Sequence, residues 1–92
     1  MKIKNKTDLG AQIDVERFNT AYHLILRGFV NCFKNTYSRG KTEFRDFLYD
    51  KMGCSLLEAE ILVDALEKDG KIEFRRFRKG MRYGTWKIHS KP

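Results

Sequence analysis

Apolar residues recur every three or four positions from Val15 to Phe33, the spacing of one face of an α-helix. Asp14 precedes this run and can accept hydrogen bonds from the free amides of a first turn, so it is the expected N-cap. The pattern predicts a first helix from Asp14 to about Asn35, followed by "TYSRGK" as a short polar connection. Gly28 inside this helix costs about 1 kcal/mol relative to alanine, which indicates a close backbone contact there.

Two shorter helices follow with little between them. Thr42 is the expected N-cap of "TEFRDFLYDKM", and Gly53 supplies the left-handed residue that ends it. Ser55 begins the third helix, and Glu58 stands at the spacing of a capping box. The third helix is expected to end at Gly70. The predicted inward residues are Phe44, Phe47, Leu48 and Met52 on the second helix, and Leu57, Ile61, Leu62, Ala65 and Leu66 on the third.

The period changes to two after Gly70. "KIEFRRF" and "YGTWKIH" both alternate apolar and polar residues, which is typical of half-buried strands. The connection between them contains Gly80, so the two runs predict an antiparallel hairpin. Arg76 and Phe77 break the alternation, which predicts a bulge or an early loop there. The expected inward residues are Ile72, Phe74, Trp86 and Ile88.

The stretch "LEKDGKIEF" also looks like the middle of a calcium-binding EF-hand loop. If Gly70 is the sixth loop residue, Ala65 is the first and Arg76 the twelfth. The calcium site needs a carboxylate at the first position and a bidentate glutamate at the twelfth. Ala65 has no side-chain oxygen and Arg76 is a cation, so calcium binding is rejected. The stretch is expected to be a junction between a helix and a strand.

Three helices followed by a hairpin resemble the winged helix-turn-helix family over residues 14–89. The resemblance is carried by "LVDALEKDGKIEF" and "YGTWKI", where a helix closes at glycine, a strand starts at isoleucine, and an aromatic-containing strand returns after the wing loop. "RGK", before Thr42, is expected to be a short strand that completes the wing sheet. The residues at the family's positions are Leu62, Leu66, Gly70, Ile72, Trp86 and Ile88.

The expected fold class is therefore α+β: a small winged helix, made of a three-helix bundle followed by a two-stranded antiparallel β-hairpin wing. The expected organisation is a flexible basic arm at residues 1–12, the winged-helix domain at 13–89 and a tail at 90–92. A different helical bundle with an appended hairpin is the alternative arrangement.

The net charge of the chain is concentrated near its C-terminal end. The 92 residues carry a net charge of +7. All of this excess lies in residues 71–92, because residues 1–70 hold equal numbers of basic and acidic side chains. A compact positive region attracts polyanions such as nucleic acid, an anionic membrane or an acidic partner. The basic residues of the final segment are Lys71, Arg75, Arg76, Arg78, Lys79, Arg82, Lys87 and Lys91, against Glu73 alone.

The family resemblance implies a nucleic-acid reader whose third helix enters the major groove and whose wing touches phosphates or the minor groove. The hairpin agrees with this, because the planar fork of arginine suits phosphates and base edges. The expected function is a small DNA-binding protein that contacts double-stranded DNA through its wing, with a regulatory or accessory role in transcription. The expected binding residues are Arg75, Arg76, Arg78, Lys79, Arg82 and Lys87, with minor contacts from Lys51, Ser55, Lys2, Lys4 and Lys6.

The third helix does not fit groove reading. Residues 55–69 carry five acids and one lysine, a local charge of −4 that phosphates would repel. The alternative function is a protein–protein interaction module of winged-helix fold that uses this acidic helix and does not read DNA. A homodimer is a further alternative, because Phe29, Val30, Phe33 and Tyr37 widen the apolar side of the first helix; core packing is the preferred interpretation.

Other classes of function receive little support from the sequence. No nucleophile–base pair, glycine-rich phosphate loop or paired carboxylates are visible, so no enzymatic activity, small-molecule substrate or cofactor is expected. Cys32 and Cys54, with His23 and His89, lack metal-ligand spacing, so buried free thiols and no metal are expected. No signal peptide or membrane-length apolar run is visible, and a cytoplasmic setting without membrane binding is expected.

Overall fold

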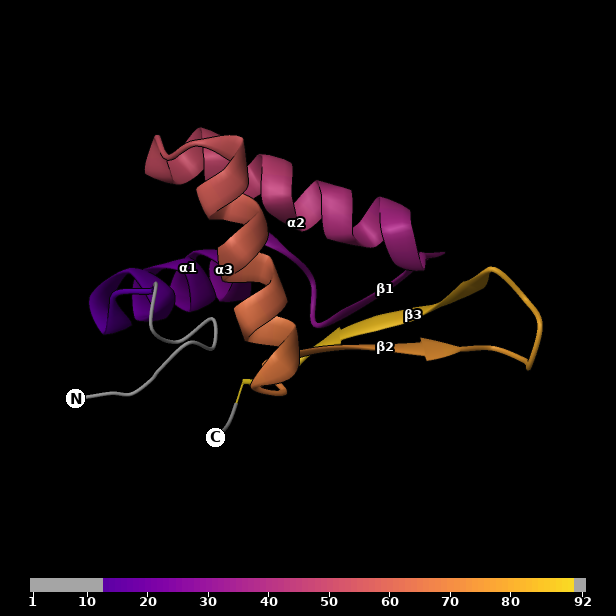
Figure 1. The fold of residues 1–92 in the computed structure, drawn as a ribbon. Coiled ribbons are helices and arrows are strands. Elements are labelled where there is room, and N and C mark those ends of the chain that lie inside the picture. Colours follow the sequence, from indigo (N-terminus) through magenta and orange to yellow (C-terminus); the bar gives the residue numbers. More distant parts are fainter. Residues whose placement is uncertain (1–12, 91–92) are drawn as a thin grey trace.

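The computed structural model of the protein describes residues 13–90. The strands form one antiparallel sheet in the order β1-β3-β2, and the helices gather on one face of it (Figure 1). The described chain is thus a small α+β fold, which confirms the expected class at this level. Its elements are α1 (Val15–Gly28), β1 (Cys32–Thr36), α2 (Tyr37–Met52), α3 (Leu56–Lys68), β2 (Ile72–Arg76) and β3 (Tyr83–Ile88).

Several helix ends are set by the residues that the sequence indicated. The Asp14 side chain accepts a hydrogen bond from the Glu16 amide at the start of α1. The Ser55 hydroxyl accepts one from the Glu58 amide at 3.0 Å, and Gly53 ends α2 with a φ of 66°. These three predictions are confirmed. The Glu58 carboxylate turns to Arg17 of α1, with which it forms an ion pair.

The end of α1 corrects the predicted first helix. α1 stops at Gly28, Phe29 takes an extended conformation (φ −123°, ψ 152°), and the residues expected to continue the helix form β1. The helical spacing was misleading because Phe29 and Phe33 both pack on Phe44, at ring-centroid distances of 4.8 and 5.7 Å. Both rings therefore pack against the core, which was the preferred interpretation of these apolar residues.

The close contact expected at Gly28 is present. A Cβ added to this residue would lie 2.2 Å from Cζ of Phe47 on α2. The missing side chain therefore lets α1 end directly against the Phe47 ring, which packs in turn on Phe29 at 5.0 Å.

The two-stranded sheet and the strand expected at residues 39–41 are wrong. Those residues lie in the first turns of α2, which begins at Tyr37 rather than after Thr42. The N-cap is Thr36, whose hydroxyl accepts a hydrogen bond from the Arg39 amide at 3.1 Å. The sheet gains its third strand from β1 instead, which pairs antiparallel with β3 from Cys32↔Lys87 to Thr36↔Tyr83.

The inner side of the sheet forms part of the core. Trp86 of β3 is fully buried, with Phe33 of β1 and Phe74 of β2 as its neighbours across the sheet. Its indole N–H donates to the carbonyl oxygen of Thr36 at 3.2 Å, and its ring stacks on Tyr37 at 5.5 Å. The inward orientation predicted for the strand residues is confirmed, since Ile72 and Ile88 are buried as well.

The hairpin of β2 and β3 ends in an early loop. Pairing runs without interruption from Ile72↔Ile88 to Arg76↔Gly84, and the Phe77 amide still donates to the Tyr83 carbonyl at 3.2 Å. The break in alternation at Arg76 and Phe77 therefore marks the point where the strand leaves the core.

The prediction that both cysteines are buried is confirmed for Cys54 and wrong for Cys32. Cys54 is buried, whereas Cys32 is exposed, because it occupies an outward position of β1. The expected basic arm at residues 1–12, with Lys2, Lys4 and Lys6, lies outside the described residues. Across residues 13–90, no helix has the length and apolar character needed to cross a membrane.

Candidate functional site

The basic residues expected in the wing lie on the hairpin, which extends beyond the helices (Figure 1). Five of them are exposed and Lys87 is half-buried. Lys51 and Ser55, expected to make minor contacts, lie at the far end of α2 and at the N-cap of α3, so the structure does not bring them near the hairpin. The five exposed residues are Arg75, Arg76, Arg78, Lys79 and Arg82.

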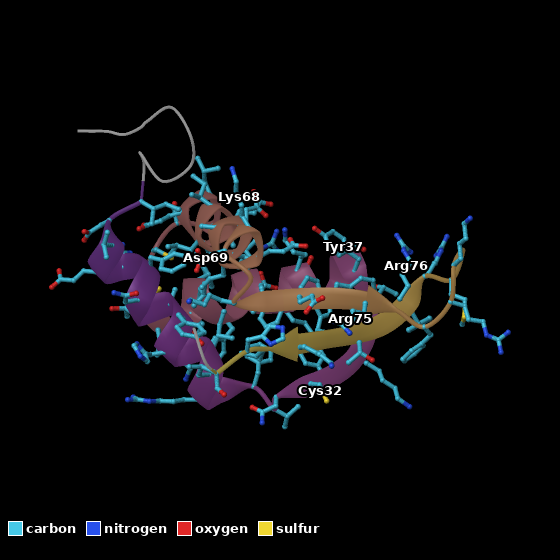
Figure 2. All side chains as sticks on the ribbon, turned by 90° about the horizontal axis from the view of Figure 1, so that it is seen from below. Cys32, Tyr37, Lys68, Asp69, Arg75 and Arg76 are labelled. Carbon is cyan, nitrogen blue, oxygen red and sulfur yellow. The ribbon has the colours of Figure 1, made fainter. Side chains whose placement is uncertain are left out.

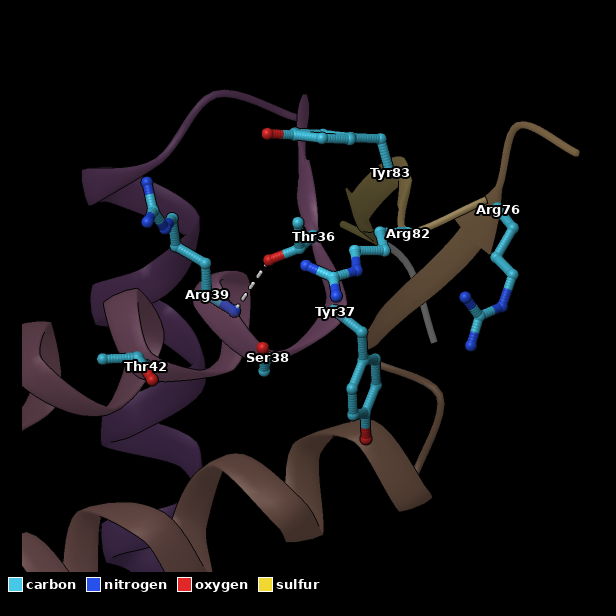
Figure 3. A pocket seen from close by; sticks show the side chains of 8 residues that line it. All are labelled: Thr36, Tyr37, Ser38, Arg39, Thr42, Arg76, Arg82 and Tyr83. Carbon is cyan, nitrogen blue, oxygen red and sulfur yellow. Dashed lines mark hydrogen bonds between the residues drawn. The ribbon is translucent and has the colours of Figure 1, made fainter. Parts of the chain in front are cut away.

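A pocket of about 630 Å³ opens between the hairpin and the first turn of α2 (Figure 3). Three arginines from separate segments line it, and we call it the arginine pocket. Arg39 comes from α2, Arg76 from the end of β2, and Arg82 from the residue before β3. The other lining residues are Thr36, Tyr37, Ser38, Thr42 and Tyr83.

The three guanidinium groups of the arginine pocket carry uncompensated charge. Within residues 13–90, no carboxylate lies at ion-pair distance from Arg39, Arg76 or Arg82. Arg76 donates through Nη1 to the Met81 carbonyl at 2.7 Å, which fixes its side chain across the hairpin. In Figure 3 the Arg82 side chain points toward the first turn of α2. The partial positive charge of that helix end adds to the arginines.

The hairpin tip adds two further exposed cations. Arg78 and Lys79 are exposed in the connection between β2 and β3. The connection closes with a hydrogen bond from the Met81 amide to the Arg78 carbonyl at 3.1 Å. Gly80, at a φ of 87°, supplies the left-handed residue of this turn. The tip is thus a tight, positively charged turn with a backbone that can approach a ligand closely.

Tyr37 forms a fixed wall of the arginine pocket. Its ring packs on Trp86 and on Phe74, both at 5.5 Å, and its hydroxyl donates to Oε1 of Glu67 at 2.9 Å. Burial raises the pKa of Tyr37, and the hydrogen bond to Glu67 raises it further. The hydroxyl therefore stays protonated, and the ring is held in place from both ends.

The acids of α3 are engaged with cations of the other two helices. Lys41 of α2 lies 2.5 Å from Oδ1 of Asp64 and 2.9 Å from Oε1 of Glu67, and Glu58 pairs with Arg17 of α1. Burial alone would lower the pKa of Lys41, but its hydrogen bonds to Asp64 and Glu67 outweigh this and raise it. Much of the −4 charge counted along α3 is therefore balanced across the fold.

Sequence reasoning missed Arg39 as a member of the site. It lies in "TYSRGK", which was predicted to be a connection, and only the early start of α2 places it beside the hairpin. Its neighbour Thr36 carries the one local signal, because a threonine three residues before Arg39 can be an N-cap.

The arginine pocket presents guanidinium and hydroxyl groups, which are groups that can donate hydrogen bonds to an anion. Residues 13–90 contain no group of three or more histidine, cysteine or acidic side chains arranged to hold a metal. No family model, curated protein or solved structure matches the chain.

Proposed function

We propose that this chain is a winged-helix domain that binds nucleic acid through phosphate contacts of the hairpin and the arginine pocket. The order helix–strand–helix–helix–strand–strand, with the sheet order β1-β3-β2, supports the winged-helix assignment. The connection between β2 and β3 takes the place of the wing. Double-stranded DNA is the first target to test, in a regulatory or accessory role.

A single observation carries the proposal: three arginines without carboxylate partners surround one open pocket. A guanidinium binds phosphate through two parallel, charge-assisted hydrogen bonds, which makes arginine well suited to a phosphate backbone. Arg39, Arg76 and Arg82 line this pocket from three separate segments, whereas a charged edge strand that only stays soluble needs no cations from other segments. Arg78 and Lys79 extend the positive surface along the hairpin.

Binding of this kind is weakly sequence-specific, because phosphate contacts position a protein without reading bases. The pairing of Asp64 and Glu67 with Lys41 lowers the repulsion that α3 would exert on phosphates. The same pairing leaves fewer free acids for a protein partner of α3, so that alternative gains no support. The proposal places the chain in the cytoplasm, and its two free cysteines fit a reducing compartment.

The test compares two triple variants of equal charge. The pocket variant is Arg39→Ala/Arg76→Ala/Arg82→Ala, and the control is Arg27→Ala/Lys51→Ala/Lys68→Ala, which removes three exposed cations elsewhere. Affinity for a short DNA duplex is measured by calorimetry over a range of salt concentrations. The pocket variant should lose most of its affinity, and its log–log salt slope should become shallower by about 0.9 for each phosphate contact removed.

The control should retain binding with nearly the wild-type slope. Equal losses in both variants would mean diffuse attraction to net charge and would remove the pocket from the proposal. A wild-type chain that binds no duplex at low salt would refute binding to double-stranded DNA. Circular dichroism of each variant establishes that the fold is intact.

A further inference from the structure

The face of the sheet that points away from the helices is open to solvent. Figure 2 views the sheet from this side, with Cys32 and Arg75 labelled on it. Successive side chains of a strand alternate between faces, and directly paired residues share a face. The strand register therefore assigns this outer face two full rows, Cys32–Lys87–Glu73 and Lys34–Thr85–Arg75, and the pair Thr36–Tyr83. Phe77 directly follows β2, and its amide donates to the carbonyl of Tyr83.

Two aromatic rings lie in solvent where the hairpin leaves this face. Phe77 and Tyr83 are 48% and 55% exposed, and the hydrogen bond between their backbones makes them cross-strand neighbours at the base of the hairpin tip. In contrast, the ring of Phe74 packs against the buried Trp86 inside the fold. Exposed aromatic rings lose favourable burial, so a pair of them beside cations points to a ligand with its own flat apolar faces.

The cations around these rings form a positively charged track. Lys34 and Lys87 have no carboxylate at ion-pair distance in the described chain, and Arg75 shares Glu73 with His89. Two residues along a strand advance about 6.6 Å, so successive rows of this face lie at increasing, regular distances from the two rings. Tyr83 also lines the arginine pocket, which makes the rings and the phosphate-binding groups neighbours.

We propose that the outer face binds unpaired nucleic acid, with bases stacked on Phe77 and Tyr83 and the backbone held by Lys34, Arg75 and the arginine pocket. This inference rests on the proposed function and names the strand state that the site prefers. Bases in a duplex are stacked on each other and hide their flat faces, whereas single-stranded bases can stack on aromatic side chains. A lipid surface fits less well, because Thr85 and charged side chains surround the rings on the same face.

The test uses ligands that share a backbone and differ in their bases. A short oligothymidylate, an abasic oligomer of equal length and a duplex are titrated into the wild-type chain at one salt concentration. The oligothymidylate should bind at least about tenfold more tightly than the abasic oligomer, since stacking of one base on an aromatic ring is worth about that factor. It should also bind more tightly than the duplex.

Single-residue variants then test whether Phe77 and Tyr83 cause the preference for an oligomer that carries bases. Phe77→Leu and Tyr83→Leu keep an apolar side chain without the ring, and each should remove most of the preference for bases while binding to the abasic oligomer remains. Tyr49→Leu is the matched control, because Tyr49 is a comparably exposed aromatic residue on α2. This variant should behave as wild type.

Each other outcome would refute a specific claim of the proposal. Equal affinity for the oligothymidylate and the abasic oligomer would refute stacking and leave phosphate binding intact. A base preference that persists in both leucine variants would mean that the bases stack on residues other than Phe77 and Tyr83. Binding to none of the three ligands would refute the proposed function itself. Loss of binding to phosphatidylserine vesicles in the leucine variants, without any base preference in the wild type, would assign the rings to a membrane.

Discussion

The α-carbon of Gly40 lies against the indole of Trp86, where the first turns of α2 meet β3. A Cβ at this position would lie 1.9 Å from Nε1 of Trp86. The same Nε1–H donates to the carbonyl of Thr36, which is also the N-cap of α2. One missing side chain thus allows the helix start, the buried indole and β1 to meet at a single point.

Replacing Gly40 by alanine should lower the free energy of unfolding by about 2–3 kcal/mol, because the added methyl group either displaces Trp86 or strains the helix. Thermal unfolding followed by circular dichroism measures the loss. Ser38→Ala is the control, since Ser38 is exposed in the same turn and should change stability by less than about 0.5 kcal/mol. Unchanged stability in Gly40→Ala would mean that Trp86 has room to move.

Single residues were predictable from sequence where their role is local. Asp14 and Ser55 act on amides two or three positions away, and Gly53 acts through its own backbone angle. Gly40 and Arg39 were not predictable, because their partners Trp86 and Arg82 stand near the other end of the chain. Their importance exists only once the sheet has brought those segments together.

At the scale of elements, the contact between α2 and α3 depends on Lys41. Its ammonium group bridges Asp64 and Glu67 of α3 and lies 5.4 Å from the centre of the Tyr37 ring. Its side chain is 20% exposed, so these ion pairs are partly shielded from water. Lys41 therefore adds a polar link between two helices that also pack through buried apolar residues.

Replacing Lys41 by methionine should lower the free energy of unfolding by about 1–2 kcal/mol, a value for charged hydrogen bonds discounted for partial exposure. The folded chain raises the pKa of Lys41 above its ordinary 10.5. Its contribution is therefore fully present below the ordinary value and is lost only as the pH rises through the raised one. Chemical denaturation should show the same deficit throughout about pH 6 to 9. Lys51→Met serves as the control, and a deficit confined to one end of that range would contradict the assignment.

The elements divide into those that the sequence specified and those that it did not. The third helix and the hairpin follow clear periods. The predicted inward residues are confirmed for Leu62 and Leu66 of α3 and for Ile72, Trp86 and Ile88 of the hairpin. Leu57, in contrast, was wrongly predicted, since it is 67% exposed in the first turn of α3. In the segment from Phe29 to Lys41, Phe29, Phe33 and Tyr37 follow helical spacing, and no alternation of apolar and polar residues marks Cys32–Thr36 as a strand. The residues of β1 form a strand because they pair with β3, and no local sequence pattern can reveal that pairing. Since α2 begins directly after β1, the position of its first residue depends on the same pairing.

The whole molecule separates opposite charges. The hairpin and the arginine pocket are positive, while the acids of α3 lie on the helical part and pair with Arg17, Lys41 and Arg45. The sequence of α3 is strongly acidic, but in the folded chain cations of α1 and α2 neutralise part of its negative charge. A polyanion can therefore approach the hairpin without meeting an unshielded negative helix.

Replacing Glu58, Glu60 and Asp64 by glutamine should leave duplex affinity unchanged or raise it. The three substitutions remove negative charge and free cations on α1 and α2, so any gain should be largest at low salt and fade as salt screens it. Calorimetric titration with a DNA duplex measures this effect. A marked loss of affinity in a folded variant would show that α3 contacts bases after all.

Trp86 gives the protein a built-in optical probe. It is the single tryptophan of the chain, is enclosed by Tyr37, Phe44 and Phe74, and is bonded to Thr36 on the wall of the arginine pocket. Its emission therefore arises from one dry site and shifts to longer wavelength when the core opens to water. Because that site adjoins the pocket, the same emission can register an occupant there without any attached dye.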